Sequence, residues 1–227
     1  MDRGLYIAAS GMAAELARQD QIANDLANAA TPGYKADRST QRQFGELLLA
    51  NMETGRTIGT SSLGVAIDRT VTDMSQGPIR DTGQPLDLAI EGDGMFVVRT
   101  AAGERYTRAG QFQRSADGTL VTPQGDAVLG RDGGPVRVRP DGTVDATQLR
   151  VVTVTGATKA GGNLFTGQAA DAPAPLVRTG ALETSGTNAA RAMVDLIASM
   201  RAFEATQRAI TTIDTTLQKT ANQVGQT

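Results

Sequence analysis

Carboxylates beside glycine are the side chains in this sequence that come closest to a pattern with known chemistry. Five of them directly precede a glycine: Glu91, Asp93, Asp117, Asp132 and Asp141. A calcium-binding EF-hand would need alternating oxygen ligands and a glutamate that closes the loop, and none of these segments has that pattern. Because Asp-Gly is also the ordinary sequence of a tight hairpin turn, we interpret these residues as turns.

The sequence also lacks the residues that most other kinds of catalytic site use. The chain has no Cys and no His, which removes disulfides, thiolate metal ligands and the commonest general base. Two carboxylates could hydrolyse a glycan if they faced each other across a site, but nothing in the sequence singles out a pair. We therefore predict no catalytic residues, no metal ligands and no cofactor.

The charge and hydropathy of the 227-residue chain limit its partners. It has 22 basic and 24 acidic residues with no block of one sign, so we expect no nucleic acid, which would need a basic stripe. No apolar stretch is long enough to span a lipid bilayer. Residues 1–14 are largely apolar, but Ser10 and Gly11 interrupt them, which predicts an amphipathic helix rather than a cleaved signal peptide.

The N-terminal segment, residues 3–30, has helical periodicity. An apolar track at heptad a and d positions runs along it, interrupted by Glu15 and Gln19 and flanked by Leu16. The track consists of Leu5, Ala8, Met12, Ile22, Leu26 and Ala29. Pro32 disfavours helical geometry in the residue before it, so the helix should end there.

The C-terminal segment, residues 188–224, has a stronger heptad pattern. Eight of its ten a and d positions are apolar, as in a coiled coil. These positions are Met193, Leu196, Met200, Phe203, Gln207, Ile210, Asp214, Leu217, Ala221 and Val224. The segment begins at Thr187 or Asn188 as N-cap. Because it is rich in threonine, a poor helix former, its last two heptads should require packing against the N-terminal helix or other chains.

Between the helices, short apolar segments alternate with turns that contain glycine. This pattern predicts an antiparallel all-β module over residues 64–182. Residues 156–175 are weakly patterned, and we expect them to form a loop. The polar residues of 103–108, which include Arg108, are interpreted as a solvated strand face.

The predicted fold class is therefore α+β. Long N- and C-terminal helices pair as an antiparallel coiled-coil domain, and an antiparallel all-β domain is inserted between them. We expect an N-terminal helix over 1–33, a linker or extended region over 34–63, the β domain over 64–182 and the C-terminal helix over 183–227. The β domain should fold alone, whereas the helical ends should need partners.

Several segments resemble the signatures of flagellar rod and hook proteins. Residues 22–35, IANDLANAATPGYK, resemble the N-terminal signature of this family, and residues 83–90 together with 96–98 resemble its mid-chain strand pair. The resemblance continues in residues 106–112, 117–122, 125–130, 180–185 and 193–210. Only the stretches 38–62 and 155–175 fall outside it.

The chain departs from the family pattern in three places. The family usually has two Asn where this chain has Asn24-Asp25, and a frequent Phe is replaced by Met95. The frequent Ser-Asn-Val-Asn before the C-terminal helix is here the sequence SGTN of residues 185–188.

The resemblance implies a structural subunit of the flagellar basal-body rod that forms a helical axial tube, transmits torque and carries exported subunits. Its partners would be copies of itself, other rod and hook subunits and the flagellar type III export apparatus. It would be extracytoplasmic and exported without a cleaved signal peptide. We expect the assembly contacts to involve, in the N-terminal helix, Leu5, Met12, Leu16, Ile22, Asn24, Leu26 and Asn28, and, in the C-terminal helix, Met193, Leu196, Met200, Phe203, Ile210, Leu217 and Val224.

Two alternatives remain open from the sequence. One is a hook or hook–filament junction protein, although the short chain with a single β module is closer to proximal or distal rod proteins. The other, from a different class, is an extracytoplasmic glycan-binding module or hydrolase. Glycan binding favours exposed aromatic residues, and the chain has three Tyr, five Phe and no Trp.

Overall fold

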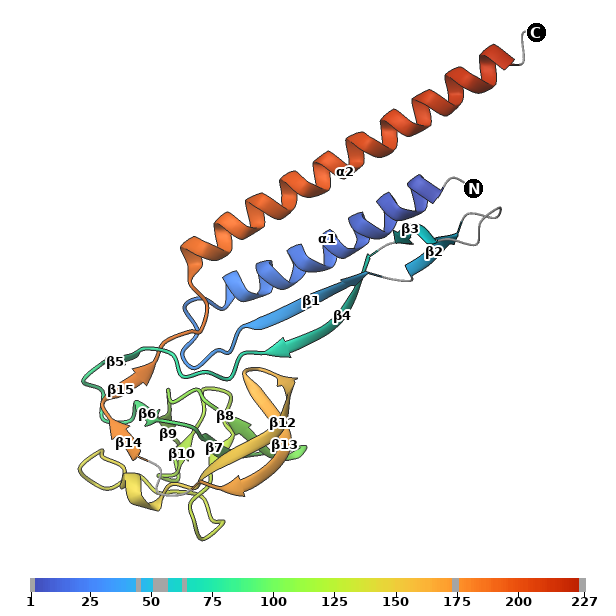
Figure 1. Cartoon of the computed structure of the whole chain (residues 1–227). Helices are drawn as coiled ribbons and strands as arrows, with labels where there is room; N and C mark the ends of the chain where they lie inside the picture. Colours follow the sequence, from blue (N-terminus) through green and yellow to red (C-terminus); the bar gives the residue numbers. More distant parts are fainter. Residues whose placement is uncertain (1–2, 44–45, 51–56, 63–64, 173–175, 225–227) are drawn as a thin grey trace. The chain divides into compact units, whose positions relative to one another are not determined.

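The computed structural model describes residues 3–43, 46–50, 57–62, 65–172 and 176–224 of the chain. It has the predicted α+β class, with helix α1 (Arg3–Ala27) at the N-terminus, helix α2 (Ala189–Val224) at the C-terminus and antiparallel strands between them (Figure 1). The chain forms two compact units. The helical unit comprises Met1–Leu26, Asp37–Val71 and Ala189–Thr227, and the β unit comprises Ala27–Ala36 and Thr72–Asn188.

The helical unit contains paired strands as well as α1 and α2. Strand β1 (Asp37–Gln43) pairs with β4 (Val65–Thr72), and β2 (Glu46–Ala50) pairs antiparallel with β3 (Thr57–Ser62). The described part of the region expected to be a linker or extended is thus largely strand. Within that region, β1 is polar, β2 has a run of three leucines and β3 is mostly small and polar, so none of them alternates apolar with polar residues.

The β unit is built on one antiparallel sheet in which β7 (Met95–Thr100) is central. The sheet order is β12-β13-β8-β7-β11-β10-β9, and β12 pairs with β7 as well, so that β7, β8, β13 and β12 form a closed ring. The remaining strands of the sheet are β8 (Gly103–Thr107), β9 (Gln113–Arg114), β10 (Leu120–Val121), β11 (Ala127–Val128), β12 (Val151–Gly161) and β13 (Leu164–Asp171).

Two further strand pairs and a short helix complete the β unit. Strand β6 (Leu88–Glu91) pairs with β14 (Leu176–Thr179), and β5 (Ile79–Asp81) pairs with β15 (Ala181–Glu183). The 3₁₀ helix η1 (Ala146–Gln148) is N-capped by Asp145, whose side chain accepts from the Thr147 amide.

The core of the β unit consists of apolar side chains from β6, β7, β10, β11 and β12 and from the loops between strands. Phe96 is completely buried and meets Phe112 edge to face, with ring centroids 5.2 Å apart. Other buried members are Leu88, Ile90, Val98, Leu120, Val128, Val136, Val138, Val144, Leu149 and Val151. Burying each such side chain contributes about 1.5–3 kcal/mol, so this unit holds most of the closed apolar core.

The loop expected at residues 156–175 is wrong over its described part. Strands β12 and β13 extend through it as a long hairpin, with Asn163 in the left-handed region (φ 63°) at its turn. The outer half of the hairpin is mostly exposed and rich in Thr, Ala and Gly. This half lacks an apolar face, so its sequence shows no alternation of apolar and polar residues. Its structure depends on the backbone pairing of the two strands. Residues 173–175 lie outside the described residues.

Within the part of the chain that the structure describes, neither helix combines the length and the apolar character that crossing a bilayer requires.

Candidate functional site

The inward face of α2 is a regular heptad seam. Its residues are the buried or half-buried side chains Ala192, Leu196, Ser199, Phe203, Thr206, Ile210 and Ile213, which follow one another at alternating steps of four and three. This is the spacing of coiled-coil a and d positions. We call these residues the α2 seam.

The residues predicted as the assembly track of α2 divide between two faces. Leu196, Phe203 and Ile210 belong to the α2 seam. Met193 and Met200 are instead 49% exposed, because the smaller Ala192 and Ser199 occupy the seam positions beside them. Leu217 is 47% exposed, and Val224, the last residue of α2, has a side chain outside the described set.

The predicted residues of α1 divide in the same way. Met12, Ile22, Leu26 and Asn28, the last just beyond the helix, are half-buried. Leu5 and Leu16 are exposed, as is the polar Asn24. The most buried position of the helix interior is Ala14, which was not predicted.

Distances between described residues place α1 beside α2. The buried Ser199 hydroxyl donates to the Glu15 carboxylate at 2.6 Å. Near the other end of the pair, a Cβ built on Gly4 would lie 3.8 Å from Cδ1 of Ile213. Since the residue number rises along α1 as it falls along α2, the two helices run antiparallel.

A second, exposed face of α2 carries large apolar side chains. Met193, Val194, Ile197 and Met200 expose between 49% and 65% of their surface. Their spacing places Met193, Ile197 and Met200 on one side of the helix, with Val194 adjoining them. We call these four residues the α2 stripe. It is one of the larger exposed apolar groups in the described residues, and such groups typically mark interaction surfaces.

The threonines of α2 satisfy their hydroxyl groups within the helix. Each of six donates to a backbone carbonyl three or four residues earlier: Thr206, Thr211, Thr212, Thr215, Thr216 and Thr220. This back-bonding leaves few hydroxyl donors for a partner, and it slightly weakens the helix.

The β unit contains a buried cluster of charges that the sequence reading missed. Glu183 accepts from Lys35 Nζ at 2.7 Å through Oε1 and from Arg108 Nε at 2.5 Å through Oε2. The side chains of Lys35 and Glu183 are each 2% exposed, and that of Arg108 is 4% exposed. We call these three residues the ionic junction.

Backbone groups satisfy the rest of the ionic junction. Lys35 Nζ also donates to the Ser75 carbonyl at 2.6 Å, and the Gly77 amide donates to Glu183 Oε1 at 2.8 Å. The remaining guanidinium nitrogens of Arg108 donate to the carbonyls between β6 and β7, at residues 90, 92 and 94. With these bonds, the buried charges avoid the cost of burial without a partner.

Close backbone approach holds the N-terminal part of the junction in place. Gly33 has φ 67°, and a Cβ built on it would lie 2.4 Å from the Arg108 carbonyl oxygen. Its amide donates to the Glu183 carbonyl at 2.9 Å. Only glycine fits this position, because any other side chain would collide with the backbone and would also be strained there.

The interpretation of Arg108 as part of a solvated strand face is wrong. It lies one residue beyond β8, where the chain turns inward and the guanidinium reaches the β6–β7 turn. One feature of the sequence could have identified the junction. Lys35, Arg108 and Glu183 each lie in a different segment that resembles a family signature, and each of these segments contributes one buried charge.

The acidic turns are confirmed at Asp117, Asp132 and Asp141, whereas Glu91 is the last residue of strand β6. Asp117 and Asp141 each accept from the threonine two residues later, and Asp132 accepts from the Gly134 amide. The Ser115 and Thr119 hydroxyls lower the pKa of Asp117, and the Thr143 hydroxyl is the main cause of the lowered pKa of Asp141. The carboxylates therefore act as local turn caps.

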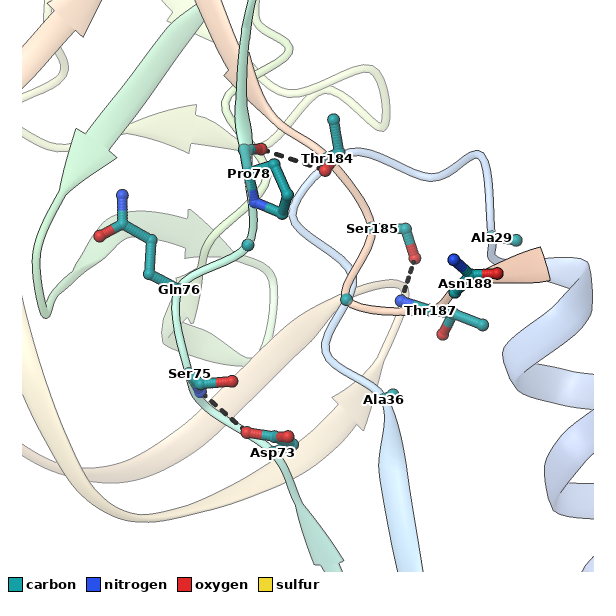
Figure 2. A pocket seen from close by; sticks show the side chains of 12 residues that line it. Ala29, Ala36, Asp73, Ser75, Gln76, Pro78, Thr184, Ser185, Thr187 and Asn188 are labelled. Atoms are coloured by element: carbon teal, nitrogen blue, oxygen red, sulfur yellow. Dashed lines mark hydrogen bonds between the residues drawn. The ribbon is translucent and has the colours of Figure 1, made fainter. Parts of the chain in front are cut away.

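The β unit has a shallow cavity of about 420 Å³, and Figure 2 shows the residues that line it. Its wall includes Ser75 and Gly77, which bond the junction, and Thr184, which donates to the Pro78 carbonyl at 3.0 Å. Asp73 is its one ionisable lining residue, and that carboxylate accepts from the Ser75 amide. Within the described residues, no three His, Cys, Asp or Glu side chains are grouped to hold a metal ion.

Three protein-family models match successive parts of the chain. Residues 5–35 match "Flagella basal body rod protein", residues 89–157 match "Flagellar hook protein FlgE/F/G D1 domain", and residues 178–224 match "Flagellar basal body rod FlgEFG protein C-terminal". Lys35, Arg108 and Glu183 fall one in each of these segments.

Relatives that match along nearly the whole chain are also flagellar rod or hook-basal body proteins. The chain is 32% identical to the flagellar basal-body rod protein FlgG of Bacillus subtilis, with 98% of this chain and 99% of the relative covered. It is 33% identical to the rod protein FlgF of Escherichia coli, over 94% of this chain and 95% of the relative. A flagellar hook-basal body complex protein of Bacillus subtilis, FlhO, is 30% identical, with 99% of both chains covered.

Proposed function

Because the chain belongs to the flagellar basal-body rod protein family, we propose that it is a structural subunit of the bacterial flagellar rod. It assembles by packing its terminal helices against copies of itself and against other rod and hook subunits. The product is a helical axial tube that transmits torque and carries exported subunits. The observation that carries the proposal is the exposed α2 stripe.

The α2 stripe supplies the driving force for assembly. Its four side chains are each about half exposed or more. Removing apolar surface from water contributes about 25 cal/mol per Å², so covering the exposed part of one such side chain contributes roughly 1 kcal/mol. A neighbouring subunit that covers all four gains several times that amount, and the gain recurs at every subunit.

Within each subunit, we propose that α1 and α2 pair as an antiparallel coiled coil along the α2 seam. The seam has unbroken heptad spacing, and the bond between Ser199 and Glu15 lies on it. Small residues at Ala192 and Ser199 permit close approach, while Phe203 and Ile210 supply apolar knobs. The α2 stripe then remains available to neighbouring subunits.

The place of assembly follows from the same proposal. The subunit is extracytoplasmic, is delivered by the flagellar type III export apparatus and keeps its N-terminal helix without cleavage. The absence of Cys suits a chain that passes through several redox environments. Its role is structural rather than enzymatic, in agreement with the rod and hook-basal body names of its relatives.

A charge placed on the α2 stripe tests the proposal. Ile197→Glu puts a carboxylate at the centre of the stripe, whereas Ala198→Glu puts the same side chain at the next exposed position of the same helix. In a strain lacking the native gene, we expect both variants to be expressed and exported. Only Ile197→Glu should be missing from purified basal bodies and leave the cells non-motile.

Immunogold labelling of basal bodies carrying the tagged wild-type subunit identifies its position. Label along the rod supports the proposal, whereas label confined to the hook or its junction with the filament supports the alternative. Protein that never sediments with basal bodies would contradict both structural assignments. Basal bodies that are complete with Ile197→Glu would show that the α2 stripe is not an assembly surface.

A further inference from the structure

The ionic junction connects the two ends of the chain that forms the β unit. Lys35 lies in its N-terminal segment and Glu183 lies in β15, near its C-terminal end, 148 positions later. Backbone bonds join the same two segments, from the Gly33 amide to the Glu183 carbonyl at 2.9 Å and from the Gly186 amide to the Tyr34 carbonyl at 2.8 Å. The β unit is thus closed by its own ends.

The charges of the junction make the closure of the β unit depend on Glu183. Among the bonds of the described residues, Glu183 is the one carboxylate that meets either Lys35 or Arg108. If β15 left while the rest of the unit stayed closed, two cations would remain buried without a counter-ion. An uncompensated buried charge is far more costly than a buried pair that keeps its partner.

We propose that the ionic junction is an interlock: the β unit has no stable form that is closed around Lys35 and Arg108 while Glu183 is unseated. The β15 strand therefore does not detach locally, as a peripheral three-residue strand usually would. Its release opens the whole unit. This inference concerns the chain itself and stands whether or not the protein is a rod subunit.

Native-state hydrogen exchange on the full-length protein tests the interlock. The amides of Gly180 and Thr184 bond to the carbonyls of Asp87 and Pro78 and report on β15. The amides of Leu120 and Leu129 bond to the carbonyls of the buried Val136 and Val97 in the core and report on global opening. With the interlock, protection factors of the two pairs agree within about tenfold. Protection of the β15 pair that is a hundredfold lower or more would overturn it.

Charge variants test the cause of the coupling. Glu183→Gln leaves both cations unpaired, so exchange at all four amides should accelerate together by roughly 100-fold or more. Lys35→Met leaves the pair of Arg108 and Glu183 intact and should have an effect at least tenfold smaller. The matched control, Glu91→Gln, removes the carboxylate of an exposed ion pair with Arg178 and should change exchange less than threefold.

The outcomes separate an interlock from simple packing. Acceleration confined to Gly180 and Thr184 in Glu183→Gln, with the core amides unchanged, would overturn the proposal. An equal effect of Lys35→Met and Glu183→Gln would show that charge compensation is not the cause. If Glu183→Gln does not fold, the wild-type exchange pattern and Lys35→Met still decide the question.

Discussion

Large apolar side chains have opposite environments in the two units. Phe96, Leu120 and Val152 of the β unit are completely buried, whereas Tyr6, Val194 and Ile197 of the helical unit expose 52–65% of their surface. The β unit covers most of its large apolar side chains with its own strands and loops. The helical unit leaves many of its own exposed, so we expect its stability to depend on what packs against it. The two units thus differ in how much of their apolar surface they cover by themselves.

Glycine replacement should give the largest difference between the units. A Cβ on Gly110 would lie 1.6 Å from the Leu88 carbonyl oxygen, in a position that no side-chain movement can relieve. We expect Gly110→Ala to cost about 4 kcal/mol or more of unfolding free energy, at the upper end for single substitutions. Chemical denaturation of the purified monomer, followed by circular dichroism, measures it.

The matched change in α1 should have the opposite sign. Gly11 has no atom within 4 Å of a built Cβ. Because alanine is the better helix former, Gly11→Ala should stabilise α1 by about 1 kcal/mol. If both glycine variants changed stability by similar amounts, the contrast between a closed and an open unit would be lost.

A charge placed at Leu217 should affect the assembled rod and not the monomer. Leu217 is 47% exposed in the Thr-rich half of α2, so Leu217→Asp should change monomer stability by less than about 0.5 kcal/mol. In the assembled rod the new carboxylate would be buried without a partner, at a cost of several kcal/mol. We expect export without rod growth, seen by electron microscopy of basal bodies and by motility.

Thr216→Asp is the control for Leu217→Asp. It places the same charge one position away, on an exposed residue outside the predicted track. Complete rods with Leu217→Asp, or equal damage from the two variants, would contradict the assembly role predicted for Leu217.

Removing the hydrogen bond between α1 and α2 should have a smaller effect on stability. Ser199→Ala removes the buried hydroxyl that donates to Glu15 at 2.6 Å. A hydrogen bond to a charged group contributes about 1.5–3 kcal/mol, partly offset by the better helix propensity of alanine. We expect faster hydrogen exchange in α1 and unchanged exchange in the β unit. Thr212→Ala, whose hydroxyl bonds only its own helix, should leave α1 unaffected.

The smallest expected effect is a pH dependence confined to the β-unit turns. The Thr143 hydroxyl lowers the pKa of Asp141 below its ordinary value of 3.8. A lowered folded-state pKa stabilises the fold above the ordinary value, and this contribution disappears as the pH falls through the folded pKa. Asp141→Asn should therefore flatten the pH dependence of the urea midpoint below about pH 4. Thr143→Val should flatten it similarly; an unchanged slope in both variants would contradict the turn-cap role.

Local patterns in the sequence predicted the local structure of this protein. The helix bounds follow from heptad spacing and Pro32, and the strands of the core follow from apolar pairs between Asp-Gly turns. The predicted heptad track of α2 differs from its more buried face by one residue at alternate positions, because Met193 and Met200 are more apolar than the buried Ala192 and Ser199. Hydropathy ranks side chains, but close packing between helices can select the smaller ones.

Long-range structure could not be predicted in this way. The hairpin of β12 and β13 lacks an apolar face, so its pairing left no pattern in sequence. The ionic junction consists of single charges in three distant segments, and an isolated Lys, Arg or Glu has the same appearance whether it is buried or solvated. Only the resemblance of the three segments to one family's signatures indicated that they act together.

The 148-residue separation of Lys35 and Glu183 also affects how fast the β unit can fold. Contacts between distant residues form slowly, because the chain must close a large loop before it gains any interaction, at an entropic cost of roughly 4 kcal/mol. Folds dominated by such contacts typically need milliseconds to seconds. A chain synthesised or exported from its N-terminus therefore cannot complete its β unit until nearly all of its length has emerged.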